Sequence, residues 1–204
     1  MSLEFLINQP MHEKSVFISS GEISGDFYAG EFIEHLRDHA HLRIFALGGE
    51  KCIQKKATLL YDTTSIATVG LWEVLATLRQ WRTVWQLSTR CILDHRPSVV
   101  IAIDNPGFNL RLIRFCRKQG IPVIYFIPPQ VWVWKKKRAR ILAKEVDWIL
   151  TIFSWEGDYF SRWGGRVKWV GHPILSRFAT GGFFTNTSPR NVIVHLPGSL
   201  LQEI

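Results

Sequence analysis

Cysteine is scarce in this chain of 204 residues and occurs only at positions 52, 91 and 116. Three is an odd number and the residues are far apart, which excludes a disulfide framework and a redox or zinc motif of paired cysteines. We therefore expect reduced thiols, as in the cytosol. His35 and His39 lie four residues apart but have no third ligand at a suitable spacing, so we expect no metal and no cofactor.

Long hydrophobic runs are also missing. The longest, Ile121–Trp134, contains three prolines and is too broken to span a bilayer. The segment Met1–Lys14 has acidic residues and a proline where a signal peptide has a basic start and an apolar block. Any membrane contact is therefore expected to be peripheral.

Acidic residues are few relative to basic ones, 17 against 25, and the formal net charge is +8. This excess predicts an anionic partner: a phosphorylated substrate, an anionic lipid or nucleic acid. Nucleic acid is disfavoured, because the basic residues lie on no recognisable recognition helix or RNA-binding strand. The apolar fraction of 47% is sufficient for the core of one large domain.

Short β-branched runs alternate with helix-length segments along the chain. This alternation predicts an α/β fold with a doubly wound, parallel, Rossmann-like sheet. We expect helices from the glycine loop to about residue 38 and over residues 70–94, 108–119 and 154–163. The expected strands are 15–20, 43–47, 58–61, 99–103, 121–127, 146–152 and 166–170.

The first strand leads into a glycine loop and then a helix, an arrangement that directs backbone N–H groups at an anion. The candidate binding residues there are Gly21, Glu22, Ser24, Gly25 and Asp26. The loop has neither the GxGxxG nor the Walker A spacing, and no ribose-binding acid follows the second strand, which disfavours a nicotinamide enzyme. The alternative is an ordinary turn with Ser24 or Asp26 as the helix N-cap.

The central strand, Val99–Ile103, ends directly in Asp104. A carboxylate at this edge of a parallel sheet lies beside the ligand crevice and can accept a proton from a substrate hydroxyl. Pro106 is expected to keep Asn105 extended, and Asn109 to cap or begin the next helix. The alternative is that Asp104 and Asn105 only shape a turn.

The helix expected over residues 70–94 carries apolar residues on more than one side. A stripe at helical spacing is expected to face the core: Leu71, Val74, Leu78, Trp81 and Trp85. Leu71, Trp72 and Leu75 form a candidate membrane-surface patch, with a helix buried between neighbours as the alternative. A second candidate surface is basic and follows the aromatic residues Trp132 and Trp134; it consists of Lys135, Lys136, Lys137, Arg138 and Arg140. Its alternative is a solvated helix face.

Seven short motifs, in order along the chain, resemble those of the lipid-A-disaccharide synthase family, glycosyltransferases of the two-domain GT-B architecture. The motifs are Ser20–Asp26 (SGExSGD), Gly48–Gly49, Val69–Leu75, Asp104–Asn109 (DxPxFN), Pro129–Trp134, Gly171–Pro173 (GHP) and Leu196–Ser199 (LPGS). The resemblance implies inverting transfer of 2,3-diacylglucosamine from UDP to 2,3-diacylglucosamine 1-phosphate (lipid X). It also implies a peripheral, cytoplasmic location on the inner membrane of Gram-negative bacteria.

The resemblance also implies roles for individual residues. Asp104 would be the base for the acceptor 6-hydroxyl, and Asn105 and Asn109 would orient Asp104 or a sugar hydroxyl. Trp132 and Trp134 would support the acyl chains or a sugar face. The remaining substrate-binding candidates are the five glycine-loop residues, His172 and Ser199.

Three segments are expected along the chain. Residues 1–177 would form the acceptor and membrane domain, 178–190 a linker, and 191–204 the start of a truncated donor-binding domain. Leu200 stands where the family usually has an arginine. We therefore expect little or no transferase activity from this chain unless a carboxyl-terminal half is supplied. The alternative function is a non-catalytic module that binds lipid or membrane.

Overall fold

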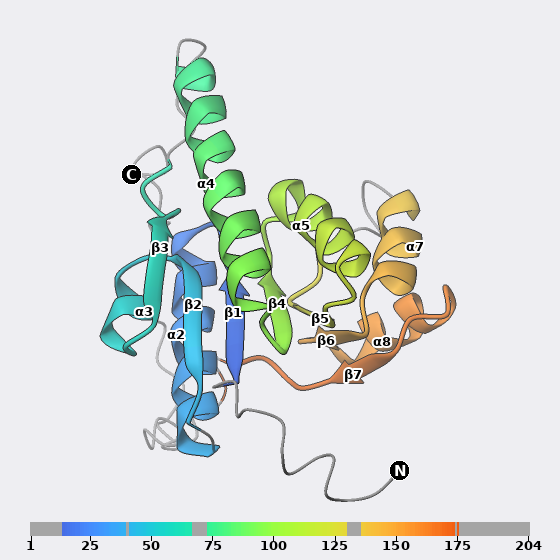
Figure 1. The fold of residues 1–204 in the computed structure, drawn as a ribbon. Helices are drawn as coiled ribbons and strands as arrows, with labels where there is room; N and C mark the ends of the chain where they lie inside the picture. Colours follow the sequence, from blue (N-terminus) through green and yellow to red (C-terminus); the bar gives the residue numbers. More distant parts are fainter. Residues whose placement is uncertain (1–13, 40, 67–72, 130–135, 174, 176–204) are drawn as a thin grey trace, which may run out of the picture. The chain divides into compact units, whose positions relative to one another are not determined.

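A computed structural model describes residues 14–39, 41–66, 73–129, 136–173 and 175 (Figure 1). The chain divides into two compact units, Met1–His172 and Pro173–Ile204, and the first contains every helix and strand named below. The predicted linker at 178–190 and the segment 191–204 lie outside the described residues.

A parallel sheet of seven strands forms the centre of the first unit, in the order β3-β2-β1-β4-β5-β6-β7. Every pairing is parallel, and β1 lies between β2 and β4, where the strand order reverses. The doubly wound α/β sheet is therefore confirmed. The strands are β1 (Ser15–Ser19), β2 (Arg43–Gly48), β3 (Thr58–Asp62), β4 (Val99–Ile103), β5 (Val123–Phe126), β6 (Trp148–Thr151) and β7 (Val167–Trp169).

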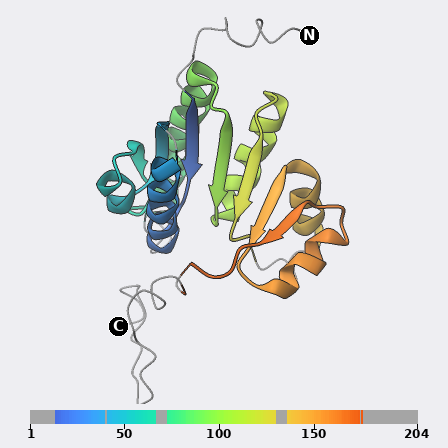
Figure 2. The same cartoon turned by 90° about the horizontal axis from the view of Figure 1, so that it is seen from below.

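Helices cover both faces of this sheet (Figures 1 and 2). On one face α2 and α3 bury Ala29, Ile33 and Cys52 against β1, β2 and β4. On the other face α4, α5, α7 and α8 contribute to a second apolar cluster. The helices are α2 (Ile23–His39), α3 (Glu50–Gln54), α4 (Glu73–His95), α5 (Pro106–Lys118), α7 (Lys136–Glu145) and α8 (Ser154–Ser161).

The central strands are apolar because both of their faces are covered. Phe17, Ile18, Ala102 and Ile103 expose no more than 1% of their surface. The three cysteines are buried as free thiols, and burial raises the pKa of Cys91 to about 11 and that of Cys116 to about 12. At neutral pH these thiols are therefore protonated core residues.

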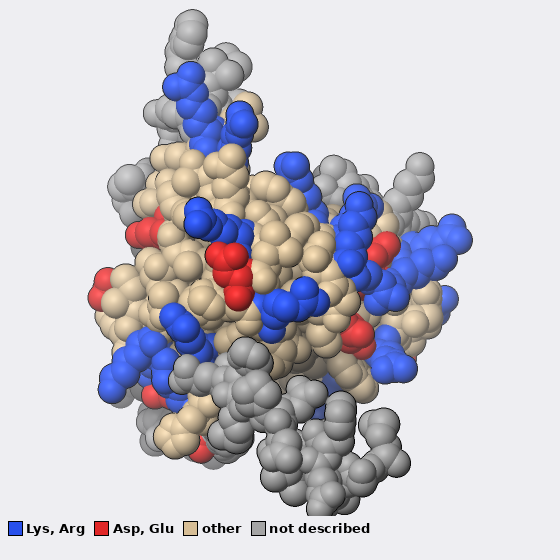
Figure 3. Space-filling model, in the orientation of Figure 1, with Lys and Arg blue, Asp and Glu red and all other residues tan. Residues whose placement is uncertain are grey.

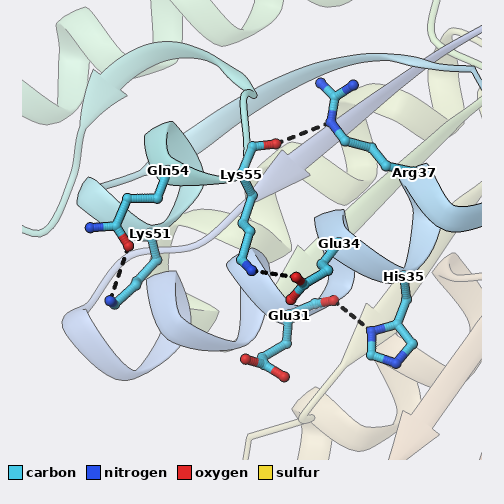
Figure 4. Close-up of polar contacts among 7 residues, drawn as sticks. All are labelled: Glu31, Glu34, His35, Arg37, Lys51, Gln54 and Lys55. Atoms are coloured by element: carbon cyan, nitrogen blue, oxygen red, sulfur yellow. Dashed lines mark hydrogen bonds and ion pairs between the residues drawn. The ribbon is translucent and has the colours of Figure 1, made fainter.

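Polar side chains join α2 to α3 on the surface (Figure 4). The Lys55 ammonium lies 2.6 Å from a Glu34 carboxylate oxygen, and the Arg37 guanidinium donates to the backbone carbonyls of Lys55 and Lys56. His35, which the sequence placed in a possible histidine pair, has its Nδ1 2.9 Å from the carbonyl oxygen of Glu31. This histidine is part of the helix surface.

Several expected local details are wrong. Asn105 is left-handed (φ 41°, ψ 61°), not extended, and it is the N-cap of α5, which begins at Pro106. Proline has no N–H group, but an N–H at the first helical position would have no partner within the helix. Pro106 can therefore begin α5, which starts two residues earlier than expected. Neither Ser24 nor Asp26 caps α2, which begins at Ile23.

Helix α3 was not among the expected elements, and α7 contains the basic segment for which a solvated helix face was the alternative interpretation. Helix α3 has only five residues, too few for an apolar period to show. None of the helices in the described ranges is both long enough and apolar enough to cross a membrane.

Candidate functional site

The glycine loop and the Asp104 loop meet because their strands are neighbours. β1 and β4 pair in parallel, with Ser19 opposite Ala102, so both loops leave the same edge of the sheet. This edge is the point of strand-order reversal, where open α/β sheets bind ligands. Residues 20–26 and 104–109, some eighty positions apart in sequence, therefore form one site.

The backbone of Asp104 is held by two side chains. Its carbonyl oxygen accepts hydrogen bonds from the Tyr125 hydroxyl at 2.6 Å and from Asn109 Nδ2 at 2.8 Å. Asp104 and Asn105 both have positive φ, 47° and 41°. Two consecutive left-handed residues turn the chain sharply out of β4, and Asp and Asn tolerate this conformation better than most residues.

The Asp104 carboxyl group is half-buried at the sheet edge. Burial raises its pKa above the ordinary value of 3.8, the negative charge of Glu22 raises it further, and a hydrogen bond from the backbone N–H of Asn105 acts in the opposite direction. Burial and the charge of Asp104 also raise the pKa of Tyr28 on α2. Asp104 therefore interacts electrostatically with Glu22 and with Tyr28.

The Asn105 side chain occupies the space where a residue other than glycine at position 21 would have its Cβ. A Cβ at position 21 would come within 2.6 Å of the Asn105 side-chain atoms, a separation that real Cβ atoms do not show. Glycine is therefore required at this position so that the two loops can approach each other.

Asn109 lies inside α5 and does not begin it. It is fully buried, accepts a hydrogen bond from Ser19 Oγ at 2.6 Å, and donates to the carbonyl oxygens of Ile103 and Asp104. One amide thus connects α5 to the ends of β1 and β4. Asn109 therefore binds the backbone of Asp104.

Asp26, a predicted substrate-binding residue, binds backbone groups of the protein itself. Its side chain is buried, and its two carboxylate oxygens accept hydrogen bonds from the backbone N–H groups of Gly49, Lys51 and Cys52 at 2.7, 2.9 and 3.2 Å. These groups belong to the start of α3, where unpaired donors need an acceptor. Asp26 therefore anchors the loop after β2. Ser24 is exposed on α2, and Gly25 packs against Ser20.

A cavity of about 730 Å³ opens beside the two loops. Gly21, Glu22 and Asn105 contribute to its lining, and the other lining residues belong to α4 and α5 except Ile66, which follows β3. Its volume is typical of a small-molecule pocket. Among the described residues the remaining lining is largely aromatic and basic and consists of Ile66, Leu78, Trp81, Arg82, Trp85, Gln86, Gly107, Phe108 and Arg111.

The predicted core stripe of α4 is correct only in part. Trp81 and Trp85 pack against the core and against Phe108, with ring centroids 5.2 and 6.0 Å apart, yet both also line the cavity. Leu78 is 60% exposed, so its assignment to the core was wrong. The amino-terminal part of α4 projects beyond the sheet (Figure 1).

Tyr28, which lies at this edge, was missed in the sequence, whereas His172 was among the predicted substrate-binding candidates. Tyr28 lies one helical turn after Ser24, a spacing that could have placed it on the same face as the glycine loop. His172 lies near it, with ring centroids 6.0 Å apart, and also contacts Phe153. The cavity residue Arg111 had no sequence signal, because only the packing of α4 against α5 brings it to the site.

Of the predicted basic surface, Arg140 is exposed on α7. Lys and Arg side chains are spread over the face formed by α4, α5 and α7, with few acidic side chains among them (Figure 3). Several other predicted site residues lie outside the described part of the chain. Leu75, Lys136, Lys137 and Arg138 belong to α4 and α7, but their side chains lie outside the described part. Also outside it are Leu71, Trp72, Trp132, Trp134, Lys135 and Ser199.

Solved structures share this fold at low sequence identity. UDP-GlcNAc 2-epimerase from Neisseria meningitidis, bound to UDP-GlcNAc, has a TM-score of 0.53 and 12% identity over 75% of this chain and 45% of its own. Glycyrrhiza uralensis UGT73P12 has a TM-score of 0.50 and 9% identity over 79% of this chain and 49% of its own. At these identities the likeness concerns the fold alone.

Sequence relatives are more informative. Lipid-A-disaccharide synthase of Gloeothece citriformis is 38% identical over 80% of this chain and 45% of its own length. Lipid-A-disaccharide synthase of Syntrophus aciditrophicus is 35% identical over 95% of this chain and 53% of its own length. Lipid-A-disaccharide synthase 1 of Legionella pneumophila strain Paris is 32% identical over 93% of this chain and 52% of its own length. The chain thus spans about half the length of these curated relatives. Because the family model for lipid-A-disaccharide synthetase matches residues 16–202, the chain belongs to the lipid-A-disaccharide synthase family.

Proposed function

We propose that this chain provides the acceptor-binding half of a lipid-A-disaccharide synthase. The acceptor is 2,3-diacylglucosamine 1-phosphate, and the donor is UDP-2,3-diacylglucosamine. The observation that carries the proposal is the half-buried Asp104 at the end of β4, followed directly by Asn105, which lines a cavity together with aromatic and basic side chains. Such a cavity suits a lipid with an anionic sugar head.

Asp104 is the proposed general base. Its carboxylate accepts the proton of the acceptor 6-hydroxyl as the oxygen attacks the anomeric carbon of the donor sugar. The bond to UDP breaks on the opposite side, so the configuration inverts and a β-1,6 linkage forms. A pKa raised by burial and by Glu22 makes the carboxylate a stronger base than an exposed aspartate.

The neighbouring residues hold this base in place. Tyr125 and Asn109 bind the carbonyl oxygen of Asp104, and Asn105 and Glu22 form the cavity wall next to it. Backbone groups of Gly21, Ser24 and Gly25 are the proposed donors to the substrate, with His172 at the same edge. Trp132, Trp134 and Ser199 keep their predicted substrate contacts as part of the proposal.

We further propose that the protein works on the cytoplasmic surface of the inner membrane. The net charge of +8 supports attraction to anionic lipid head groups. The contacts would come from Leu71, Trp72 and Leu75, and from the basic segment of Lys135, Lys136, Lys137, Arg138 and Arg140.

The test uses the purified chain with radiolabelled UDP-diacylglucosamine and lipid X, with and without a separately supplied carboxyl-terminal half from a relative. Disaccharide formed in the complemented mixture supports the proposal. Asp104→Asn should then lower kcat by about 10²- to 10⁴-fold, the usual contribution of a general base. Asp62→Asn is the matched control, because Asp62 is the last residue of β3 and its carboxylate accepts a hydrogen bond from the Thr64 hydroxyl in the loop that follows.

The second candidate function is a non-catalytic lipid-binding module. The large exposure of Leu78 at the cavity favours it, because an apolar side chain there can contact an acyl chain without any chemistry. Binding of lipid X with no disaccharide in either mixture would select this function over the transferase.

A further inference from the structure

Two arginines from different helices line the cavity. Arg82 lies on α4 and Arg111 on α5, on the same cavity as Glu22 and Asn105. Neither arginine forms an ion pair with another residue in the part of the chain that the structure describes. The cavity therefore holds two cationic groups and one carboxylate among its described lining residues.

Arg111 is positioned by an aromatic ring. Its Cζ atom lies 4.5 Å from the centroid of the Trp85 ring, a cation–π distance. The guanidinium forms no hydrogen bond or ion pair with another described residue, so its N–H groups can donate to a ligand. A planar, fixed fork of donors matches the oxygens of a phosphate.

The ring beneath Arg111 belongs to an aromatic cluster. Trp85 contacts Phe108 and Phe115, with centroids 6.0 and 5.8 Å apart, and Trp81 contacts Phe108 as well. These contacts join α4 to α5 and give the cavity an apolar wall next to its cationic groups. The wall fits a ligand that carries an apolar chain close to an anionic group.

Building on the function proposed above, we infer that Arg111, stacked on Trp85, and Arg82 bind the 1-phosphate of the acceptor sugar. Trp81, Phe108 and Leu78 then line the path of the acyl chain nearest to it. The same two cations could also bind the phosphate of a membrane phospholipid, since the two groups share their chemistry. The placement next to Asn105, which adjoins Asp104, favours the acceptor sugar.

The test measures lipid binding by the purified chain in neutral detergent micelles. The first ligand is 2,3-diacylglucosamine 1-phosphate and the second is the same lipid without its phosphate. The wild-type chain should bind the phosphorylated lipid more tightly. Arg111→Gln and Arg82→Gln should each remove about ten-fold or more of that preference, the usual effect of losing a charge-assisted hydrogen bond, and leave binding of the unphosphorylated lipid within about two-fold.

Two matched controls keep the charge change constant. Arg114→Gln and Lys118→Gln each alter an exposed residue of α5 outside the cavity lining. Both should keep the phosphate preference. Circular dichroism and urea unfolding verify that all four variants fold.

The outcomes separate this inference from the proposed function. Equal binding of both lipids by the wild-type chain, or a preference that survives in Arg111→Gln and Arg82→Gln, overturns the inference and leaves acceptor binding intact. Failure to bind either lipid overturns acceptor binding as well. Competition by phosphatidylglycerol as effective as by the sugar phosphate shows a general lipid-phosphate site and overturns the assignment to the acceptor.

Discussion

Asp104 and Asn105 lie in a conformation that most residues avoid, with φ of 47° and 41°. A left-handed non-glycine residue is destabilising by roughly 1–3 kcal/mol, and such residues persist where surrounding contacts determine the backbone. Here the contacts are the hydrogen bonds of Tyr125 and Asn109 to the Asp104 carbonyl oxygen. The bent backbone directs the chain from β4 into α5 and sets the carboxyl group at the sheet edge.

The raised pKa of Asp104 has a consequence for stability. The folded chain holds this proton more tightly than the unfolded chain, so the contribution to stability is complete below pH 3.8 and is lost as the pH rises through the higher folded-state pKa. Asn removes the charge and tolerates the same φ. In urea unfolding, the free energy of unfolding of Asp104→Asn minus that of the wild type should therefore increase between about pH 4 and about pH 8. A difference that decreases over this range would contradict a raised pKa.

The contact of Gly21 with Asn105 predicts a second effect of a single residue. Gly21→Ala would place a methyl group within 2.6 Å of the Asn105 side chain and should lower the free energy of unfolding by about 1–3 kcal/mol. Gly107→Ala is the control, because its Cβ would meet no atom closer than 4.0 Å. Combining Gly21→Ala with Asn105→Gly, which removes the whole side chain and tolerates the left-handed φ, should recover most of the loss in chemical denaturation, and no recovery would show that the strain lies elsewhere.

At the scale of elements, α2 and α3 are joined by one buried carboxylate. Asp26→Asn replaces an acceptor oxygen by a donor, so at least one of the N–H groups of Gly49, Lys51 and Cys52 loses its partner. An unpaired buried donor costs about 1–3 kcal/mol. Thermal unfolding should show this loss for Asp26→Asn and little change for Asp38→Asn, an exposed aspartate of the same helix. Equal melting temperatures would exclude the anchoring role.

At the scale of the whole molecule, the net charge of +8 predicts salt-dependent attraction to anionic surfaces. Sedimentation with vesicles containing phosphatidylglycerol should decrease when NaCl is raised from about 0.05 to about 0.5 M, since screening shortens the range of the attraction. Vesicles of phosphatidylcholine alone should bind little at either concentration. Salt-independent binding would indicate that apolar contacts dominate.

Two further variants locate the surface involved in this attraction. Arg140→Glu should weaken vesicle binding, because Arg140 belongs to the basic segment on α7. Lys118→Glu makes the same charge change on an exposed residue at the carboxyl-terminal end of α5 and should have a smaller effect. Equal effects would show that the overall charge, and not the basic segment, controls binding.

The sequence by itself determined the class of fold, the places where chemistry could occur and the family likeness. Alternation of buried strands with helices dictates a parallel sheet, and residues that follow strands must meet at its carboxyl edge. The positions of Asp104 and the glycine loop, each directly after a strand, therefore sufficed to assign them to one site. The left-handed conformation of Asn105 did not follow from the sequence, since the preference of a residue before proline is overridden by packing against Gly21.

Only the tertiary structure decided what the side chains at this edge do. It directs Asp26 to the backbone of α3, buries Asn109 between β1 and β4, and turns Trp81, Trp85 and Arg111 towards one cavity. The physical reason is that these contacts join residues of separate elements, and their geometry depends on how helices pack across the sheet. Periodicity within one segment indicates which residues prefer burial. Whether such a residue joins the core, binds another element or lines the cavity depends on which elements pack against it.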